Sequence, residues 1–163
     1  MTAAHVINCA TEIEIVTEDG MRHAATIIVV DNQRDIAILK TGLKRGPMAL
    51  WLTNFAIGEH GCAIGNSFGL GLSISCGVVS AIHRKQVGFN PIEDFVQTDA
   101  ATNPGGFGGA LVDANGRLIG MIEAIFTKKA DINAGVNFAV SVPLLIEGIE
   151  LQRRSHPQIP AVQ

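Results

Sequence analysis

Short apolar and β-branched segments, separated by turn residues, run through most of the chain and limit the folds open to it. The clearest pair, residues 111–112 and 118–125, is joined through Asn115-Gly116, a dipeptide typical of tight hairpin turns. A second hairpin, between 12–16 and 24–30, is predicted around Asp19-Gly20. Further strands are predicted at 36–39, 62–64, 73–82 and 136–140. No helical segments alternate with these strands, so the sequence predicts an antiparallel all-β sandwich or barrel.

The pattern changes near the C-terminus. After Pro143, apolar residues recur at helical spacing, and Arg153 and Arg154 close the segment, which predicts one short terminal helix. Residues 155–163 contain two prolines and are predicted to form a flexible tail. Residues 41–51 break the strand pattern and could join two halves of the chain.

Composition excludes several classes of function. With 163 residues, 47% of them hydrophobic and 17% charged, the chain suits one domain or two small subdomains. The net charge of −3 provides no basic face for nucleic acid. No apolar run is long enough to span a bilayer, and residues 1–5 do not open a signal peptide. We therefore expect a soluble protein, with no membrane span, whose compartment the composition does not determine.

The cysteines and histidines lack the spacing of a disulfide framework or a metal site. The chain has three cysteines, Cys9, Cys62 and Cys76, and no CxxC pair. An odd number without this spacing favours buried free thiols over a disulfide. The five histidines show no HxxxH pattern, so we expect no metal and no cofactor, although histidines distant in sequence can converge in a fold.

Three separate segments hold residues that could carry out chemistry. They are His5 in TAAHV, Asp35 in DIAILK, and the glycine-rich loop NPGGFGG at residues 103–109. Taken singly, His5 could be an ordinary partly buried histidine, Asp35 a turn residue, and the glycines a tight bend. Taken together, the order His, Asp and glycine-rich loop in a β-rich chain resembles the trypsin-like serine proteases.

Further motifs narrow this resemblance to the HtrA/Deg branch of that family. They are AIGNSFGLG at 63–71, GVVSA at 77–81, QTDAA at 97–101, GGALV at 108–112 and VNFAV at 136–140. The resemblance runs from residue 1 to about residue 154. It implies two perpendicular β-barrels, one in residues 1–45 and one in 49–154, with the active site between them. It also implies a periplasmic or cell-envelope location.

The resemblance implies roles for single residues. His5 matches the general base, Asp35 the carboxylate that orients it, and the backbone N–H groups of Gly105 and Phe107 the oxyanion hole. Thr102 matches the wall of the substrate pocket. Val136, Asn137 and Phe138 match the edge strand that pairs with substrate. Arg84 matches the arginine of a regulatory loop at 82–94, a segment that could equally be a solvated turn.

Two features depart from the family pattern. Phe107 stands where the nucleophilic serine belongs, and a phenyl ring has no atom that can attack a carbonyl. Phe107 could pack near His5, offer an apolar patch to a partner, or simply reflect drift. Family members also carry about two strands before the histidine motif, whereas His5 here is the fifth residue. We therefore expect an incomplete first barrel, and either self-association through its open edges or a sequence trimmed from a longer protein.

These features predict a catalytically inactive protease homologue that serves as a peptide- or protein-binding or scaffold module. Its expected partners are a protein or peptide, a second copy of the chain, or an active homologue in a mixed oligomer. Two alternatives stay open. One is an active or conditionally active serine endopeptidase, and the other is a protease domain repurposed to bind a metal through histidines such as His5 near Asp35.

Overall fold

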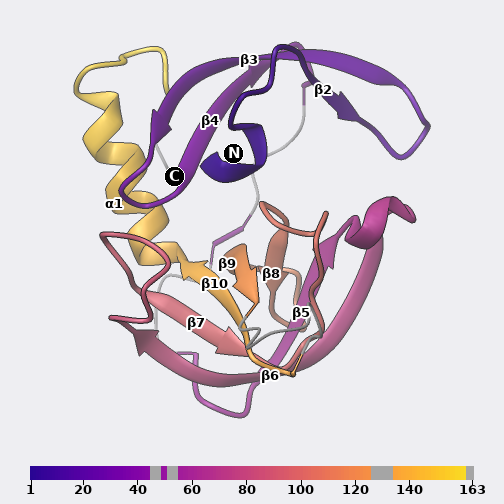
Figure 1. Ribbon diagram of the computed structural model, residues 1–163, viewed down its shortest axis with the longest axis vertical. Helices are drawn as coiled ribbons and strands as arrows, with labels where there is room; N and C mark the ends of the chain where they lie inside the picture. Colours follow the sequence, from indigo (N-terminus) through magenta and orange to yellow (C-terminus); the bar gives the residue numbers. More distant parts are fainter. Residues whose placement is uncertain (45–48, 51–54, 126–133, 161–163) are drawn as a thin grey trace.

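An open sheet and a closed barrel make up most of the computed structural model, which describes residues 1–44, 49–50, 55–125 and 134–160 (Figure 1). The open sheet has the order β1 (Thr2–Ala3), β4 (Ile36–Thr41), β3 (Arg22–Asp31) and β2 (Ile13–Val16). The barrel has the order β10 (Asn137–Ser141), β7 (Phe95–Thr98), β6 (Ser73–Arg84), β5 (His60–Gly65), β8 (Ala110–Val112) and β9 (Leu118–Ile125). The all-β prediction, with one complete barrel and one incomplete one, is confirmed.

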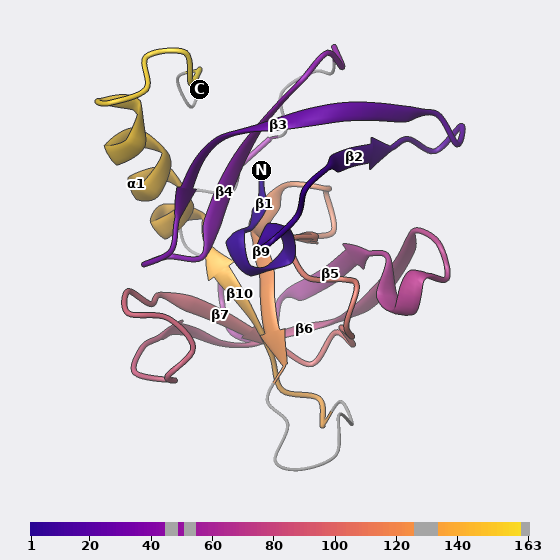
Figure 2. The ribbon, with the colours of Figure 1, turned by 45° about the horizontal axis from the view of Figure 1, so that its top comes forward.

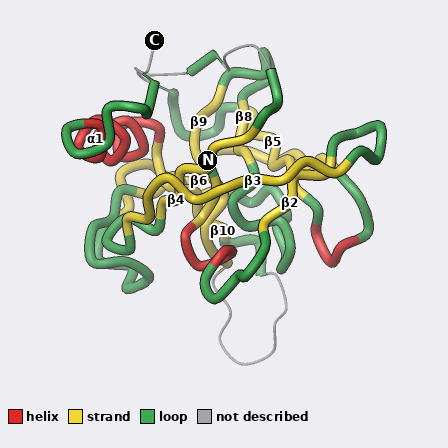
Figure 3. Tube along the Cα trace, turned by 90° about the horizontal axis from the view of Figure 1, so that it is seen from above, coloured by secondary structure: helices red, strands yellow, loops and turns green. Residues whose placement is uncertain are grey.

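Neighbouring strands pair antiparallel in the open sheet and in the barrel. Seen from above, β3 and β4 lie over the strands of the barrel (Figure 3). The barrel holds most of the core, whose large side chains are almost completely buried and include Phe95, Leu111, Ile119, Met121 and Ile122. Each contributes about 1.5–3 kcal/mol of hydrophobic stabilisation. β1 and β7 were not predicted, because β1 has only two residues and the sequence of β7, FVQT, does not alternate apolar and polar residues.

One α-helix, α1 (Val142–Arg153), follows β10 directly and confirms the predicted terminal helix. Ser141 caps it, since its Oγ accepts the backbone N–H of Leu144 at 3.4 Å. Figure 2 shows α1 beside both the barrel and the open sheet. Gly148 permits this close approach, because a Cβ there would lie 2.9 Å from Ile36 Cδ1. Among the described residues, no helix is long and apolar enough to cross a membrane.

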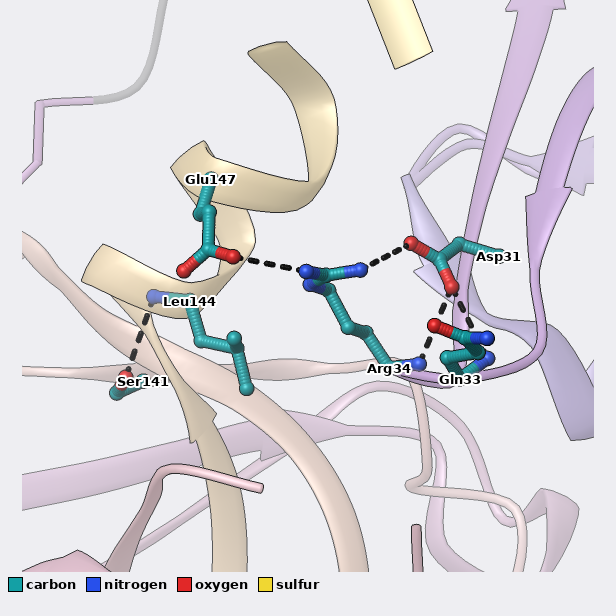
Figure 4. Close-up of polar contacts among 6 residues, drawn as sticks. All are labelled: Asp31, Gln33, Arg34, Ser141, Leu144 and Glu147. Atoms are coloured by element: carbon teal, nitrogen blue, oxygen red, sulfur yellow. Dashed lines mark hydrogen bonds and ion pairs between the residues drawn. The ribbon is translucent and has the colours of Figure 1, made fainter. Parts of the chain in front are cut away.

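A buried arginine ties the open sheet to α1 (Figure 4). Arg34 is 6% exposed, and its Nη1 donates to Asp31 Oδ2 at 3.1 Å while its Nη2 donates to Glu147 Oε1 at 2.8 Å. Asp31 is also buried, and its Oδ1 accepts the backbone N–H groups of Gln33 and Arg34. The guanidinium therefore joins the turn between β3 and β4 to the helix.

The segment after α1 folds back on the helix instead of forming a flexible tail. Ile159 is buried, and its carbonyl accepts Arg153 Nε at 3.2 Å. The His156 backbone N–H donates to the Gln152 carbonyl at 2.9 Å. The flexible-tail prediction is wrong for residues 155–160, because the apolar Ile159 finds a buried site that the neighbouring prolines do not prevent. Residues 161–163 lie outside the described residues.

Cys62 and Cys76 form a disulfide bond, so the prediction of free thiols is wrong for these two residues. β5 and β6 pair with Cys62 directly opposite Cys76, a register that the spacing along the sequence does not reveal. Cys9 is free, as predicted, but it is exposed rather than buried.

Replacing Cys62 and Cys76 together by serine should lower the free energy of unfolding by about 2–3 kcal/mol. The bond closes a loop with a sequence separation of 14, which removes conformations from the unfolded chain. Urea denaturation of the oxidised protein and of the double variant measures the difference. Cys9→Ser, which opens no loop, is the control, and a double variant as stable as this control would contradict the prediction.

Candidate functional site

His5 and Asp35 lie side by side between the open sheet and the barrel. His5 belongs to η1 (Ala4–Ile7), a 3₁₀ turn that follows β1 and lies between the two β-structures (Figures 1 and 2). Its backbone N–H donates to Asp35 Oδ1 at 2.7 Å, and its ring Nδ1 lies 2.5 Å from Asp35 Oδ2. The His5 ring is 43% exposed, whereas the Asp35 side chain is mostly buried. The structure thus brings these two predicted residues into direct contact.

The Asp35 carboxylate is held in a position to orient the imidazole. Its backbone φ of 54° lies in the left-handed region, which Asp tolerates better than most residues, and its carbonyl accepts the N–H of Ala4 at 3.0 Å. Burial works to raise the pKa of Asp35, but hydrogen bonds from the His5 ring, from Glu123 and from the His5 backbone outweigh burial and lower it. Asp35 is therefore ionised at neutral pH.

The glycine-rich loop presents Phe107 to this pair. The Phe107 and His5 rings meet edge to face, with their centroids 5.5 Å apart, so the contact considered from the sequence is present. Phe107 also packs against the buried side chains of the barrel. Gly108 follows with a φ of 78°, and a Cβ there would stand 2.1 Å from Thr2 Oγ1, so the turn requires glycine.

Two backbone amides of this loop have no acceptor among the residues that the structure describes. The Gly106 N–H donates to the Asn103 carbonyl at 2.9 Å. Within the described part of the chain, the N–H groups of Gly105 and Phe107 donate to no protein atom. They are the two groups predicted for the oxyanion hole. The loop therefore keeps two donors available for a carbonyl or carboxylate oxygen of a bound molecule.

A buried glutamate outside the predicted site, Glu123 on β9, lies against Asp35. Glu123 is 5% exposed, and its Oε1 accepts Asn90 Nδ2 at 3.0 Å. Burial raises the pKa of Glu123, the Asp35 carboxyl raises it further and the Asn90 amide opposes them, with a result of about 9. Glu123 is therefore protonated at neutral pH and can donate to Asp35. The sequence signal that could have revealed it is the single charged residue in the apolar strand LIGMIEAI.

A second glutamate outside the predicted site, Glu93, organises the β6–β7 loop at residues 85–94. Its carboxylate accepts four backbone N–H groups at 2.7–3.0 Å, those of Val87, Gly88, Phe89 and Asn90. Because the Asn90 side chain reaches Glu123, this loop is connected to the environment of Asp35. Arg84, the residue predicted for regulation, is exposed at the end of β6, and its regulatory role stays a prediction.

Glu93→Gln should loosen the β6–β7 loop. Burial works to raise the pKa of Glu93, but the four backbone donors outweigh it and lower the pKa. A carboxyl whose pKa is lowered by folding stabilises the loop above its ordinary pKa, and this contribution is lost as the pH falls through the folded-state value. Hydrogen exchange should show protection factors at least ~10-fold lower for the four amides in the variant at neutral pH.

The wild type should lose the same protection as the pH falls below about 4. The amides of β5, which do not contact Glu93, are the internal control in both experiments. Unchanged protection of the four loop amides in Glu93→Gln would show that the carboxylate does not hold the loop.

Thr102 lines a small cavity beside the glycine-rich loop, bounded also by Ser67, Ser73 and Gly106. The cavity measures about 20 Å³, room for about one water molecule. Thr102 is buried, and its Oγ1 donates to Asn137 Oδ1 at 2.9 Å. Thr102 thus lines this small cavity, and its place in the wall of a substrate pocket stays a prediction.

β10 is not an edge strand, contrary to the prediction for residues 136–140. Because the barrel closes, β10 pairs with β7 on one side and with β9 on the other. Asn137 is buried, and its Nδ2 donates to the carbonyls of Thr98 and Ala100, while the Phe138 side chain lies in the core. The pairing role predicted for Asn137 and Phe138 is therefore wrong. For Val136, which precedes the strand, substrate binding stays a prediction.

Known proteins match this chain over most of its length. A family model for the trypsin-like peptidase domain matches residues 1–121. A probable periplasmic serine endoprotease DegP-like from Buchnera aphidicola is 36% identical over 148 residues, which are 89% of this chain and 32% of that protein. Periplasmic serine endoprotease DegP from Salmonella typhimurium is 37% identical over 143 residues, which are 86% of this chain and 30% of that protein.

Solved structures share the fold. The HtrA-type protease AlgW with tripeptide superimposes with a TM-score of 0.88 at 42% identity, over 96% of this chain and 52% of that one. The serine endoprotease from Yersinia pestis has a TM-score of 0.79 at 32% identity, over 94% and 53%. This chain thus spans about a third of the two curated relatives and about half of the two solved chains. The matched family model and the shared fold show that the chain belongs to the trypsin-like peptidase family, in its HtrA/Deg-type branch.

Proposed function

We propose that this chain is a catalytically inactive homologue of trypsin-like serine proteases that binds a protein or peptide without cleaving it. The observation that carries the proposal is the position of Phe107, whose ring contacts His5 where the family resemblance places the nucleophilic serine. His5 has no hydroxyl proton to remove there. Loss of the triad serine costs about 10⁶-fold in turnover in a protease where it has been measured.

An exposed apolar strip supports the binding part of the proposal. It runs from η2 (Ser67–Gly69) to the start of β6 and consists of Phe68, Leu70, Leu72 and Ile74. Leu70 is 87% exposed and Leu72 is 75% exposed. The strip adjoins the glycine-rich loop, since the Phe68 N–H donates to the Pro104 carbonyl at 2.7 Å. A run of large apolar side chains on the surface is typical of a site for a protein partner.

A fluorophosphonate probe and unfolded casein test the inactive part. We expect no covalent labelling and no cleavage, because Phe107 supplies no hydroxyl beside His5. The Ser67 side chain lies beside Gly106, so Ser67→Ala is included as a separate variant. Labelling of the wild type at any serine would refute the proposal, and its loss in Ser67→Ala would identify the substitute nucleophile.

Fluorescence anisotropy of labelled casein tests the binding part. The wild type is expected to bind, and Leu70→Ser with Leu72→Ser is expected to weaken binding at least ~10-fold, because the variant removes apolar area from the strip. Leu151→Ser, which changes an exposed leucine on α1, is the matched control. Equal affinity in the strip variant and the control would contradict a binding role for the strip.

The open sheet supports self-association as a further part of the proposed scaffold role. Within the described residues, β2 is at the end of the sheet and pairs only with β3, which leaves the other edge of β2 available to a second chain. Size-exclusion chromatography should give an apparent mass above that of a monomer. A stable monomer at high concentration would contradict self-association.

A further inference from the structure

His5, Asp35 and Glu123 each bring one potential ligand atom to the same place. These atoms all lie within 4.8 Å of one another. Two donors to one zinc ion, each about 2 Å from it, stand roughly 3–3.5 Å apart, so side-chain shifts of about 1 Å give that spacing. One imidazole and two carboxylates are a donor set that suits divalent transition metals.

The Glu123 carboxyl provides an independent reason to expect a cation. Glu123 is 5% exposed, and its Oε2 is buried without a donor from the described residues. No hydrogen bond of normal geometry reaches this oxygen from the described residues, although the Glu123 and Asp35 carboxyls lie close enough to share a proton, and a cation between them would contact both. The Asn90 amide already holds the other oxygen at 3.0 Å, as outer contacts orient the carboxylates of metal sites.

We propose that His5, Asp35 and Glu123 bind one divalent transition-metal ion, of which Zn²⁺ is the best match to the donors. The ion reaches the carboxyl groups past the His5 ring, which is 43% exposed. Binding of the ion releases the protons that Asp35 shares with His5 and Glu123, and His5 coordinates the ion as a neutral imidazole. The site needs no hydroxyl at residue 107, so it goes beyond the proposed binding of a protein or peptide and can be tested apart from it.

Isothermal titration of the whole chain with Zn²⁺, after treatment with EDTA and its removal, tests this inference. We expect one equivalent to bind and Glu123→Gln to weaken the affinity at least ~10-fold. Gln keeps the shape and can keep the hydrogen bond from Asn90, but it removes the charged ligand. His83→Asn is the matched control, because His83 Nδ1 pairs with Asp94 Oδ1 at 3.0 Å and neither residue belongs to the proposed group of ligands.

Co²⁺ provides a second readout, since its visible absorption reports coordination directly. We expect a coordination spectrum in the wild type and in His83→Asn, and none in Glu123→Gln. If Glu123→Gln does not fold, as judged by its unfolding midpoint in EDTA, His5→Gln replaces it, because the His5 ring is 43% exposed and its replacement disturbs the core less.

Three results would overturn the inference: no saturable heat with Zn²⁺, equal affinity in the wild type and the ligand variant, or loss of binding in His83→Asn. Each would mean that His5, Asp35 and Glu123 do not form the ion-binding site. Fluorophosphonate labelling of the wild type would refute the proposed inactivity and leave the ion titration unaffected, so the two failures are distinguishable.

Discussion

Phe107→Ser should convert this chain into a reactive serine hydrolase. The His5 ring already lies 2.5 Å from Asp35, and the Gly105 and Phe107 amides have no acceptor among the described residues. The variant places a hydroxyl on the residue whose side chain now contacts His5. Because the triad serine is worth about 10⁶-fold in a measured protease, we expect peptide hydrolysis to rise by at least ~10³-fold, with fluorophosphonate labelling at residue 107.

Two control variants distinguish the effect of the new hydroxyl from the effect of removing the phenyl ring. Phe107→Ala removes the ring without adding a nucleophile and should stay unlabelled. Phe107→Ser combined with His5→Ala should lose the gain, because no base remains to take the proton. Phe107→Ser and both control variants are measured in EDTA, because an ion bound to His5 would prevent it from acting as a base. A folded Phe107→Ser protein that reacts no faster than Phe107→Ala would show that the loop and the His5–Asp35 pair are not preorganised.

Arg34→Met should lower the free energy of unfolding by about 3–5 kcal/mol, the range typical of removing one partner from a buried ion pair. Asp31 and Arg34 are each 6% exposed, so the variant leaves a buried carboxylate whose remaining donors, among the described residues, are backbone N–H groups. It also removes the link to Glu147 on α1. For a chain of this length, this loss lowers the melting temperature by roughly 6–20 °C.

Urea denaturation measures this effect against a matched control. Glu147→Gln removes the other partner of Arg34, but the Glu147 side chain is 63% exposed, so its loss should cost at most ~1 kcal/mol. Replacing Arg34 and Asp31 together by apolar residues should recover part of the stability, because no unpaired charge then stays buried. An Arg34→Met protein as stable as Glu147→Gln would show that Asp31 does not depend on the arginine.

Local patterns predicted most of the strands. The alternation and turn residues at 12–16, 24–30 and 118–125 place β2, β3 and β9 within two residues of their observed bounds, because side-chain alternation and hairpin turns depend on neighbours in the chain. The order of His5, Asp35 and the glycine-rich loop predicted which residues would meet. This inference rested on a family motif rather than on local physics.

The pairing of strands and the burial of single side chains could not be predicted in the same way. The Cys62–Cys76 bond depends on the register of β5 against β6, and the internal position of β10 depends on closure of the barrel. Ile159 finds a buried site that its own segment does not indicate. Each property depends on how strands and helices pack against one another, which the pattern within a single segment does not show.

By itself, the sequence determined that the chain is mostly β, that its histidine, aspartate and glycine-rich loop are those of a trypsin-like fold, and that residue 107 supplies no nucleophile. Only the tertiary structure decided that Glu123 lies against Asp35 and that Asn90 holds it there. The physical reason is that burial and electrostatic coupling are set by all the groups around a side chain in space. For Glu123 these groups come from β9, the β6–β7 loop and the turn before β4, which only the closed fold brings together.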